Sequence, residues 1–162
     1  MREISREPQT HSFLVKALRE AGNELVEELE AVPIREAHRR PDGEWSFCQI
    51  ARHVARSERM RLDYVQRILS RRKPELEPVD LDVEVDGRDD IRNAAYEYAS
   101  LRQDLVYTLW GEPMSVWERT GVHRYMGEIS VLQICRELHL HDLEHLWQVR
   151  SYRQQVLLGG VR

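Results

Sequence analysis

The sequence has little cysteine, glycine or proline, and it has no long apolar run. Its 162 residues include 2 Cys, 8 Gly and 6 Pro. Two cysteines cannot make the disulfide framework of a small secreted domain. No apolar run approaches the roughly 20 residues that a membrane-spanning helix needs. With a composition that is 41% hydrophobic, these absences indicate a globular protein without a membrane span.

An excess of charge of one sign is also lacking, because 24 Lys and Arg face 28 Asp and Glu. A net charge of −4 argues against nucleic acid or an anionic membrane as the main partner. Residues 1–7 lack the apolar segment of a secretory signal. We therefore expect a cytoplasmic protein with one domain over residues 1–162, which is long enough to bury a core.

Apolar residues recur at helical spacing in four segments, which predicts four helices. The helices are expected at about residues 11–31, from Ser46 to before Pro74, at about 89–110 and at 130–156. Two of them begin with the Ser-x-x-Gln spacing of a capping box, in which each side chain pairs with an otherwise unpaired backbone N–H. These boxes are Ser46 with Gln49 and Ser130 with Gln133.

The link between the second and third predicted helices is long. Residues 80–86 alternate apolar and polar side chains, but they have no evident partner strand and are interpreted as an extended linker. At about 3.3 Å per residue, residues 70–88 can span the full length of the preceding helix. The sequence thus predicts an all-α protein, a four-helix bundle with a long crossover between its second and third helices.

Histidines interrupt the apolar stripe of the fourth predicted helix. At steps of three and four residues, the inward seam comprises Val131, Ile134, Leu138, His141, His145, Gln148 and Tyr152. Burying an imidazole without a partner costs free energy, so these rings need a metal ion or a hydrogen bond. His141 and His145 lie one helical turn apart, so both rings can reach one ion.

The second predicted helix places another histidine on its inward seam. His53 lies there with Ile50, Ser57 and Met60. A lone inward His is more often a hydrogen-bonded core residue than a ligand, and a His-x-x-x-His spacing often arises by chance. Three inward histidines on two helices of one small bundle instead favour a divalent metal site.

Two other kinds of metal site are excluded by the residues around these histidines. Residues 141–145 match His-x-x-Glu-His, the inverzincin protease motif, whose site needs a carboxylate ligand well downstream. No Asp or Glu follows His145. A ferritin-like di-iron site needs Glu-x-x-His on two helices, and the sequence contains no such spacing.

An ordered set of short motifs resembles the DinB/YfiT-like family of metalloenzymes. The first motif is Pro41-Asp42-Gly43-Glu44-Trp45-Ser46, followed by His53 and Glu58, and the second is Val122-His123, Gly127 and His141-Asp142-Leu143-Glu144-His145-Leu146-Trp147-Gln148. The resemblance covers about residues 10–155. It implies a four-helix bundle whose metal is held by one His of the second helix and two of the fourth. These correspond to His53, His141 and His145.

The resemblance also indicates a class of chemistry. Characterised members of the family include S-transferases that use low-molecular-weight thiols such as bacillithiol, and a mycothiol-dependent maleylpyruvate isomerase. Three neutral imidazoles leave a divalent ion with its full charge and an open position. Zn²⁺ is the expected ion, and Ni²⁺, Mn²⁺ and Fe²⁺ are alternatives because imidazole suits several of them.

We therefore expect a metal-dependent enzyme that activates a thiol or water for attack on a small-molecule substrate. A small-thiol S-transferase is the expected type of enzyme. The alternatives are a metal-dependent hydrolase and a non-catalytic, metal-stabilised binding protein.

Three further residues are candidates for supporting the ligands or lining the pocket. Gln148 lies one turn beyond His145 and either hydrogen-bonds a ligand or is a plain polar core residue. Glu58 lies about 140° round the helix from His53, so it reaches the site only through a neighbouring helix and is otherwise salt-bridged or solvated. His123 precedes the fourth helix in a loop and is expected at the pocket mouth.

The tryptophans suggest both a cap and an assembly. Trp45 precedes the Ser46 cap and is expected to pack as a hydrophobic staple, away from substrate. Trp110, Trp117 and Trp147 do not all fit one small core. Because relatives often form dimers, we expect a homodimer.

Overall fold

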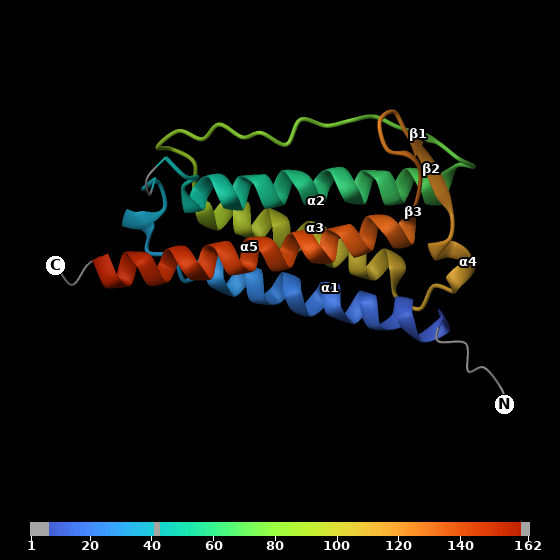
Figure 1. Ribbon diagram of the computed structural model, residues 1–162, viewed down its shortest axis with the longest axis horizontal. Coiled ribbons are helices and arrows are strands. Elements are labelled where there is room, and N and C mark those ends of the chain that lie inside the picture. Colours follow the sequence, from blue (N-terminus) through green and yellow to red (C-terminus); the bar gives the residue numbers. More distant parts are fainter. Residues whose placement is uncertain (1–6, 41–42, 160–162) are drawn as a thin grey trace.

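The long helices pack as a bundle in a computed structural model, which describes residues 7–40 and 43–159 (Figure 1). In chain order the elements are α1 (Glu7–Glu30), η1 (Ile34–Glu36), α2 (Phe47–Ser70), β1 (Glu75–Leu76), α3 (Ile91–Leu109), α4 (Met114–Trp117), β2 (Thr120–His123), β3 (Gly127–Ser130) and α5 (Val131–Gly159). Pro41 and Asp42, from the first motif, lie outside the described residues. α1, α2, α3 and α5 occupy the predicted helical segments, although α1 begins earlier than expected.

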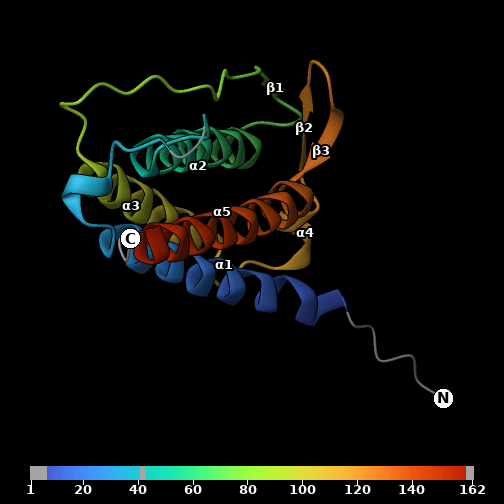
Figure 2. The same cartoon turned by 60° about the vertical axis from the view of Figure 1, so that its left-hand side comes forward.

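The directions of the helices define the topology. α1 and α5 run side by side in one direction, and α2 and α3 run together in the opposite direction (Figures 1 and 2). The link from α2 to α3 passes back along the length of α2, so both helices begin at the same end of the bundle. The predicted crossover and the predicted all-α four-helix bundle are therefore confirmed.

Local side-chain chemistry sets where two of the long helices begin. Ser46 Oγ accepts a hydrogen bond from Gln49 N at 3.1 Å, while Gln49 Oε1 accepts one from Ser46 N at 2.8 Å. Ser130 and Gln133 make the same exchange ahead of α5, at 3.1 and 2.9 Å. Both boxes form as predicted, because a capping box depends only on residues three positions apart.

A small sheet that the sequence did not predict lies at one end of the bundle. β1 pairs in parallel with β2, which places Leu76 opposite His123, and β2 and β3 form an antiparallel hairpin. Gly127 has a φ of +74° where the hairpin turns, a conformation that favours glycine. The strands are two to four residues long, which is too short for an alternating pattern to be recognised.

The tryptophans divide between the core and the surface. Trp117 of α4 is fully buried among apolar side chains of α1, α3 and α5. Trp110 is 49% exposed and Trp147 is 72% exposed, so the three indoles do not share one core. No helix within residues 7–40 and 43–159 is long and apolar enough to cross a membrane.

Candidate metal centre

Three imidazoles meet between α2 and α5. His53 Nε2 lies 2.9 Å from His141 Nε2, which in turn lies 3.0 Å from His145 Nε2. Each residue offers one ring nitrogen, and these nitrogens all lie within 4.8 Å of one another. All three residues are partly buried. The structure thus brings together the three histidines that the sequence singled out.

The outer nitrogens of two rings determine where the lone pairs point. His53 Nδ1 lies 3.1 Å from Leu81 O on the crossover, and His145 Nδ1 lies 2.8 Å from Gln148 Oε1. These oxygens only accept, so each Nδ1 carries the hydrogen and each Nε2 keeps its lone pair. Both lone pairs face His141 Nε2, which can donate at most one hydrogen. A cation satisfies all three nitrogens, whereas hydrogen bonds among them do not.

The separations between the nitrogens fit ligands of one ion. At about 2.0–2.1 Å from a shared ion, two imidazole nitrogens stand roughly 2.9 Å apart at a right angle and roughly 3.4 Å apart at the tetrahedral angle. The separations of 2.9 and 3.0 Å fall at the short end of this range. The three histidines therefore fit a divalent cation and leave at least one coordination position open.

Burial keeps the imidazoles in the neutral form that binds metal. It is the main cause that lowers the pKa of His53 and of His145 below the ordinary value. Burial is also the main cause that lowers the pKa of His141 to about 2, and the nearby His145 ring and the Arg61 guanidinium disfavour its protonation further. The hydrogen bonds to Leu81 and Gln148 oppose the shift at the outer two rings without cancelling it.

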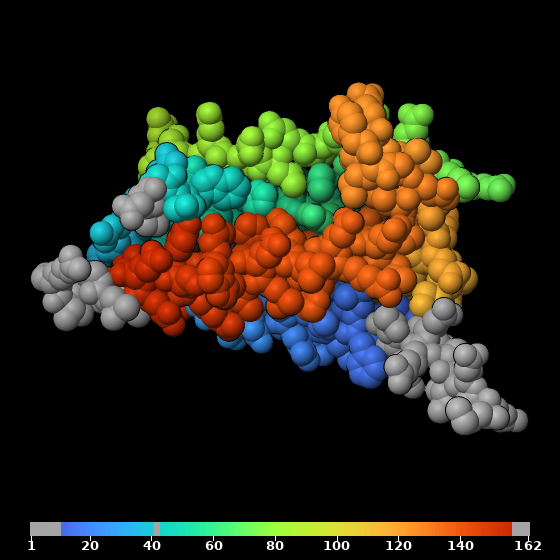
Figure 3. All heavy atoms as spheres, viewed as in Figure 1, coloured from blue at the N-terminus to red at the C-terminus, as the bar shows by residue number. Residues whose placement is uncertain are grey.

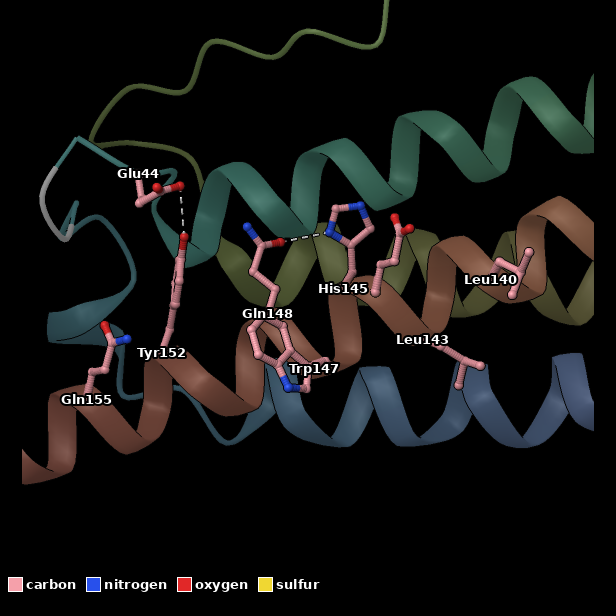
Figure 4. Close-up of a pocket in the computed structure, with 9 residues that line it drawn as sticks. Glu44, Leu140, Leu143, His145, Trp147, Gln148, Tyr152 and Gln155 are labelled. Carbon is pink, nitrogen blue, oxygen red and sulfur yellow. Dashed lines mark hydrogen bonds between the residues drawn. The ribbon is translucent and has the colours of Figure 1, made fainter.

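A groove of about 1010 Å³ opens beside His145 (Figure 4). Its polar groups converge from two segments, because Tyr152 Oη of α5 donates a hydrogen bond to Glu44 Oε2 at 3.2 Å. The lining comprises Glu44, Leu140, Leu143, Glu144, His145, Trp147, Gln148, Tyr152 and Gln155. α5 also forms a broad exposed surface of the molecule (Figure 3). The centre is therefore bordered by an open and partly polar groove.

Of the predicted supporting residues, Gln148 lies at the centre and Glu58 does not. Gln148 Oε1 accepts the hydrogen of His145 Nδ1, which is the first of its two predicted roles. Glu58 is fully buried and forms an ion pair with Arg102 of α3 at 2.7 Å. Glu58 is thus salt-bridged, which was one of the alternatives predicted for it, and it faces the interior of the bundle.

His123 corrects one expectation from the sequence. It belongs to β2 instead of a loop, and its Nδ1 accepts hydrogen bonds from the backbone of Tyr125 and Met126. Its ring packs against Tyr64 at 5.9 Å, and Tyr64 lies about 16 Å along α2 from His53. The hairpin therefore holds His123 away from the groove, and it is not among the described residues that line it.

Trp45 lies closer to the site than predicted. Its ring centroid is 4.9 Å from that of His53, while the indole also packs on the apolar cluster that contains Ile50. The staple position directly before the Ser46 cap accounts for the second contact. The first contact makes Trp45 a wall of the metal centre, a role that the sequence analysis did not assign.

A buried polar network beneath the centre was not predicted. Arg102 donates to both oxygens of Glu58 at 2.7 and 2.8 Å, to both oxygens of Asp142 at 2.7 and 2.9 Å, and to Leu18 O at 2.7 Å. Tyr98 Oη donates to Asp142 at 2.9 Å. All five N–H groups of Arg102 are therefore used. The sequence contained one sign of this network, because Arg102 and Glu58 occupy positions of two predicted helices at which apolar side chains are expected.

The same network corrects the predicted inward face of α5. Asp142 is 1% exposed, whereas the neighbouring His141 is only partly buried. The core line of α5 therefore passes through Leu138, Asp142 and Val149, and the two histidines lie on its flank, toward α2. This offset lets the imidazoles meet His53 while the network fills the bundle axis.

Comparisons with known proteins agree with this fold. The model of the DinB superfamily matches residues 17–149 of the chain. The structure is similar to that of YfiT from Bacillus subtilis, a probable metal-dependent hydrolase with an unusual four-helix bundle topology. The TM-score is 0.83 at 15% sequence identity, over 96% of this chain and 93% of YfiT. No curated protein matches the chain in sequence.

Proposed function

Because the chain belongs to the DinB superfamily, we propose that it is a metal-dependent enzyme in which His53, His141 and His145 hold a divalent cation. One observation carries this proposal: three Nε2 atoms converge, and two of them have lone pairs fixed toward the third. Zn²⁺ is our first choice of ion, with Ni²⁺, Mn²⁺ and Fe²⁺ as alternatives. A purely structural ion would be closed off by its ligands, so the open groove beside His145 favours an enzyme.

The bound cation would act as a Lewis acid that lowers the pKa of water or of a thiol in the open position. The carbonyl of Leu81 and the amide of Gln148 hold two of the ligand rings in orientation. Glu144 lines the groove, and no donor of the described residues hydrogen-bonds to it, so its carboxylate is available to accept the proton of the nucleophile.

Two nucleophiles suit this arrangement. The likeness to YfiT, a probable metal-dependent hydrolase, supports water and therefore hydrolysis. The resemblance to thiol-dependent S-transferases supports a low-molecular-weight thiol such as bacillithiol or mycothiol. A groove of about 1010 Å³ is far larger than a water molecule needs, which keeps transfer of a thiol as a second candidate.

Metal analysis tests whether the protein holds a cation, and spectroscopy then tests whether the nucleophile is a thiol or water. Protein purified without a His tag should contain about one equivalent of a divalent metal. After cobalt substitution, titration with a thiol should change the visible spectrum if the thiol binds the ion, and hydrolysis becomes the assignment if the spectrum does not change. Glu144→Gln should keep the metal and lower kcat by about 10²–10⁴. Absence of metal from the folded wild type would contradict the proposal.

A further inference from the structure

Arg61 extends back along α2 toward the three imidazoles. Its Nη1 donates a hydrogen bond to Ser57 Oγ, and Ser57 lies one helical turn, about 6 Å, beyond His53. The guanidinium therefore lies beside Ser57, one turn of α2 from the proposed ligand His53.

Most hydrogen-bond donors of this guanidinium are unused. Within residues 7–40 and 43–159, no carboxylate lies within ion-pair distance of Arg61, and the Ser57 hydroxyl is its hydrogen-bond partner. None of its nitrogens is among the described side-chain atoms that are buried without a partner. An arginine carries five N–H groups. Arg61 is thus a partly buried cation whose remaining donors are open to a ligand.

Charge balance explains only part of this placement. The four oxygens of Glu58 and Asp142 already accept hydrogen bonds from Arg102. Arg61 also offsets negative charge across the bundle, because Glu58, Glu137 and Asp142 all act on it and, together with Arg102, make three carboxylates and two guanidiniums. A lysine would supply the same charge, so this offset gives no reason for a planar group with open donors.

The groove on the other side of the centre has acidic side chains and no cation. Glu44 and Glu144 line the groove beside His145, and no Lys or Arg is among the described residues that line it. A negatively charged group is therefore repelled from the groove and attracted to Arg61. The site accordingly has a guanidinium with unused donors along α2 and an acidic, partly apolar groove along α5.

From this geometry, and resting on the proposed function, we propose that Arg61 binds a carboxylate of the substrate while the reactive end of the same molecule occupies the metal centre. A guanidinium and a carboxylate pair through two parallel hydrogen bonds. Because Ser57 lies one turn of α2 from His53, a carboxylate paired with Arg61 and an atom at the metal centre can belong to one small molecule. The substrate class is a small carboxylic acid whose uncharged end lies in the groove.

Calorimetric titration of the zinc-loaded full chain tests this assignment. The probes are malonate, succinate and glutarate, with succinamide as the uncharged analogue, and metal content is measured before each titration. At least one dicarboxylate should bind the wild type and succinamide should not. Arg61→Gln should weaken binding at least tenfold, and Arg61→Lys should fall between, because lysine keeps the charge without the planar pair. Arg67→Gln, an exposed position of α2, is the matched control and should bind as the wild type does.

Three outcomes would overturn the assignment. Equal binding by the wild type and Arg61→Gln would mean that the anion binds the metal alone. If succinamide binds as tightly as succinate, or if no dicarboxylate binds, the site does not recognise a carboxylate. Both of these measurements need only the wild-type protein. A wild-type protein that takes up no metal would instead overturn the proposed function. Titrating that metal-free protein still tests Arg61, because the guanidinium–carboxylate pair does not include the ion.

Discussion

At the scale of single residues, the proposed ligands differ from a neighbouring histidine in where their rings lie. His53 and His141 share one cluster of nitrogens, whereas His139 is absent from the described groups that can hold a metal. We expect His53→Ala and His141→Ala to lose stoichiometric metal and His139→Ala to retain it, because only the first two remove a ligand. Elemental analysis of the three purified variants decides the point. Equal metal content in all three would refute the ligand set.

Gln148 acts on the metal through the ring it orients. Its amide oxygen fixes the hydrogen on His145 Nδ1, and removing such a partner of a ligand typically weakens metal binding 10–100-fold. Gln148→Ala should therefore bind zinc about 10–100-fold more weakly in competition with a chromophoric chelator. Gln155→Ala is the control, because Gln155 lines the same groove and no hydrogen bond among the described residues joins it to a proposed ligand. Indistinguishable affinities for the two variants would exclude the orienting role.

The sequence reveals the ligands but not their partners. His141 and His145 are four residues apart, so their proximity follows from helical geometry. The partner of His53 is a backbone carbonyl at Leu81, on a link without regular structure, and no side-chain pattern encodes that contact. Arg102 meets Glu58 and Asp142 across 44 and 40 residues, which only the packed bundle determines.

At the scale of elements, one side chain joins all the long helices. Arg102 of α3 contacts α1 through Leu18 O, α2 through Glu58 and α5 through Asp142. Arg102→Met should lower the free energy of unfolding by about 3–5 kcal/mol, because it leaves two buried carboxylates without their counter-ion. Urea denaturation measures the change.

An exposed arginine provides the control for that experiment. Arg67 pairs with Asp63 one turn away on α2, and both side chains are about half exposed. Exposed pairs of this kind contribute about 0–1 kcal/mol, so Arg67→Met should have little effect on stability. A loss of similar size in Arg67→Met and Arg102→Met would show that the network is not what holds the helices together.

The contact between α1 and α5 should depend on pH. Burial raises the pKa of Glu28, but its hydrogen bonds and ion pairs with Arg150 and Arg153 outweigh that effect and hold the pKa below its ordinary value. A carboxyl whose pKa is lower in the folded state adds stability above its unfolded pKa of about 4.3, and this stability is lost as the pH falls through the folded value. The stability difference between the wild type and Glu28→Gln should thus be largest near neutral pH and disappear in acid.

Thermal unfolding at a series of pH values measures this dependence. Glu27→Gln, at an exposed neighbouring position of α1, should give a difference from the wild type that does not follow this pH profile. A Glu28→Gln difference that stays constant from neutral pH into acid would mean that the ion pairs do not stabilise the packing of α1 on α5.

Elements defined by local chemistry were predictable, and those defined by distant pairing were not. The boxes at Ser46 and Ser130 fix helix starts from four residues of sequence. β1 exists only because residues 75–76 lie beside residues 122–123 in the folded chain. The crossover was predictable from its length alone, since a tight turn does not need so many residues.

At the scale of the whole molecule, the outer face of α5 is expected to be covered. Leu140, Leu143 and Trp147 follow helical spacing, and all three are exposed. We expect a homodimer in which this stripe meets a second copy, because contiguous apolar surface favours association. Light scattering over a range of concentrations should give a dimer mass, and Trp147→Asp should reduce it. Tyr96→Asp, at an exposed aromatic of α3, should leave the mass unchanged, and a monomer mass for the wild type would contradict the expectation.

The parallel pairing of α1 with α5 and of α2 with α3 has a consequence for how the chain folds. In the bundle the main helix interfaces are α1 with α5, α1 with α3, α2 with α3, and α2 with α5. None of these pairs is joined by a short turn, so every interface must first close a long loop and lose chain entropy before it gains contacts. The relative contact order is therefore higher than in an up-and-down bundle of the same length. Folding should be correspondingly slower, and the metal centre can assemble only after the most distant segments have met.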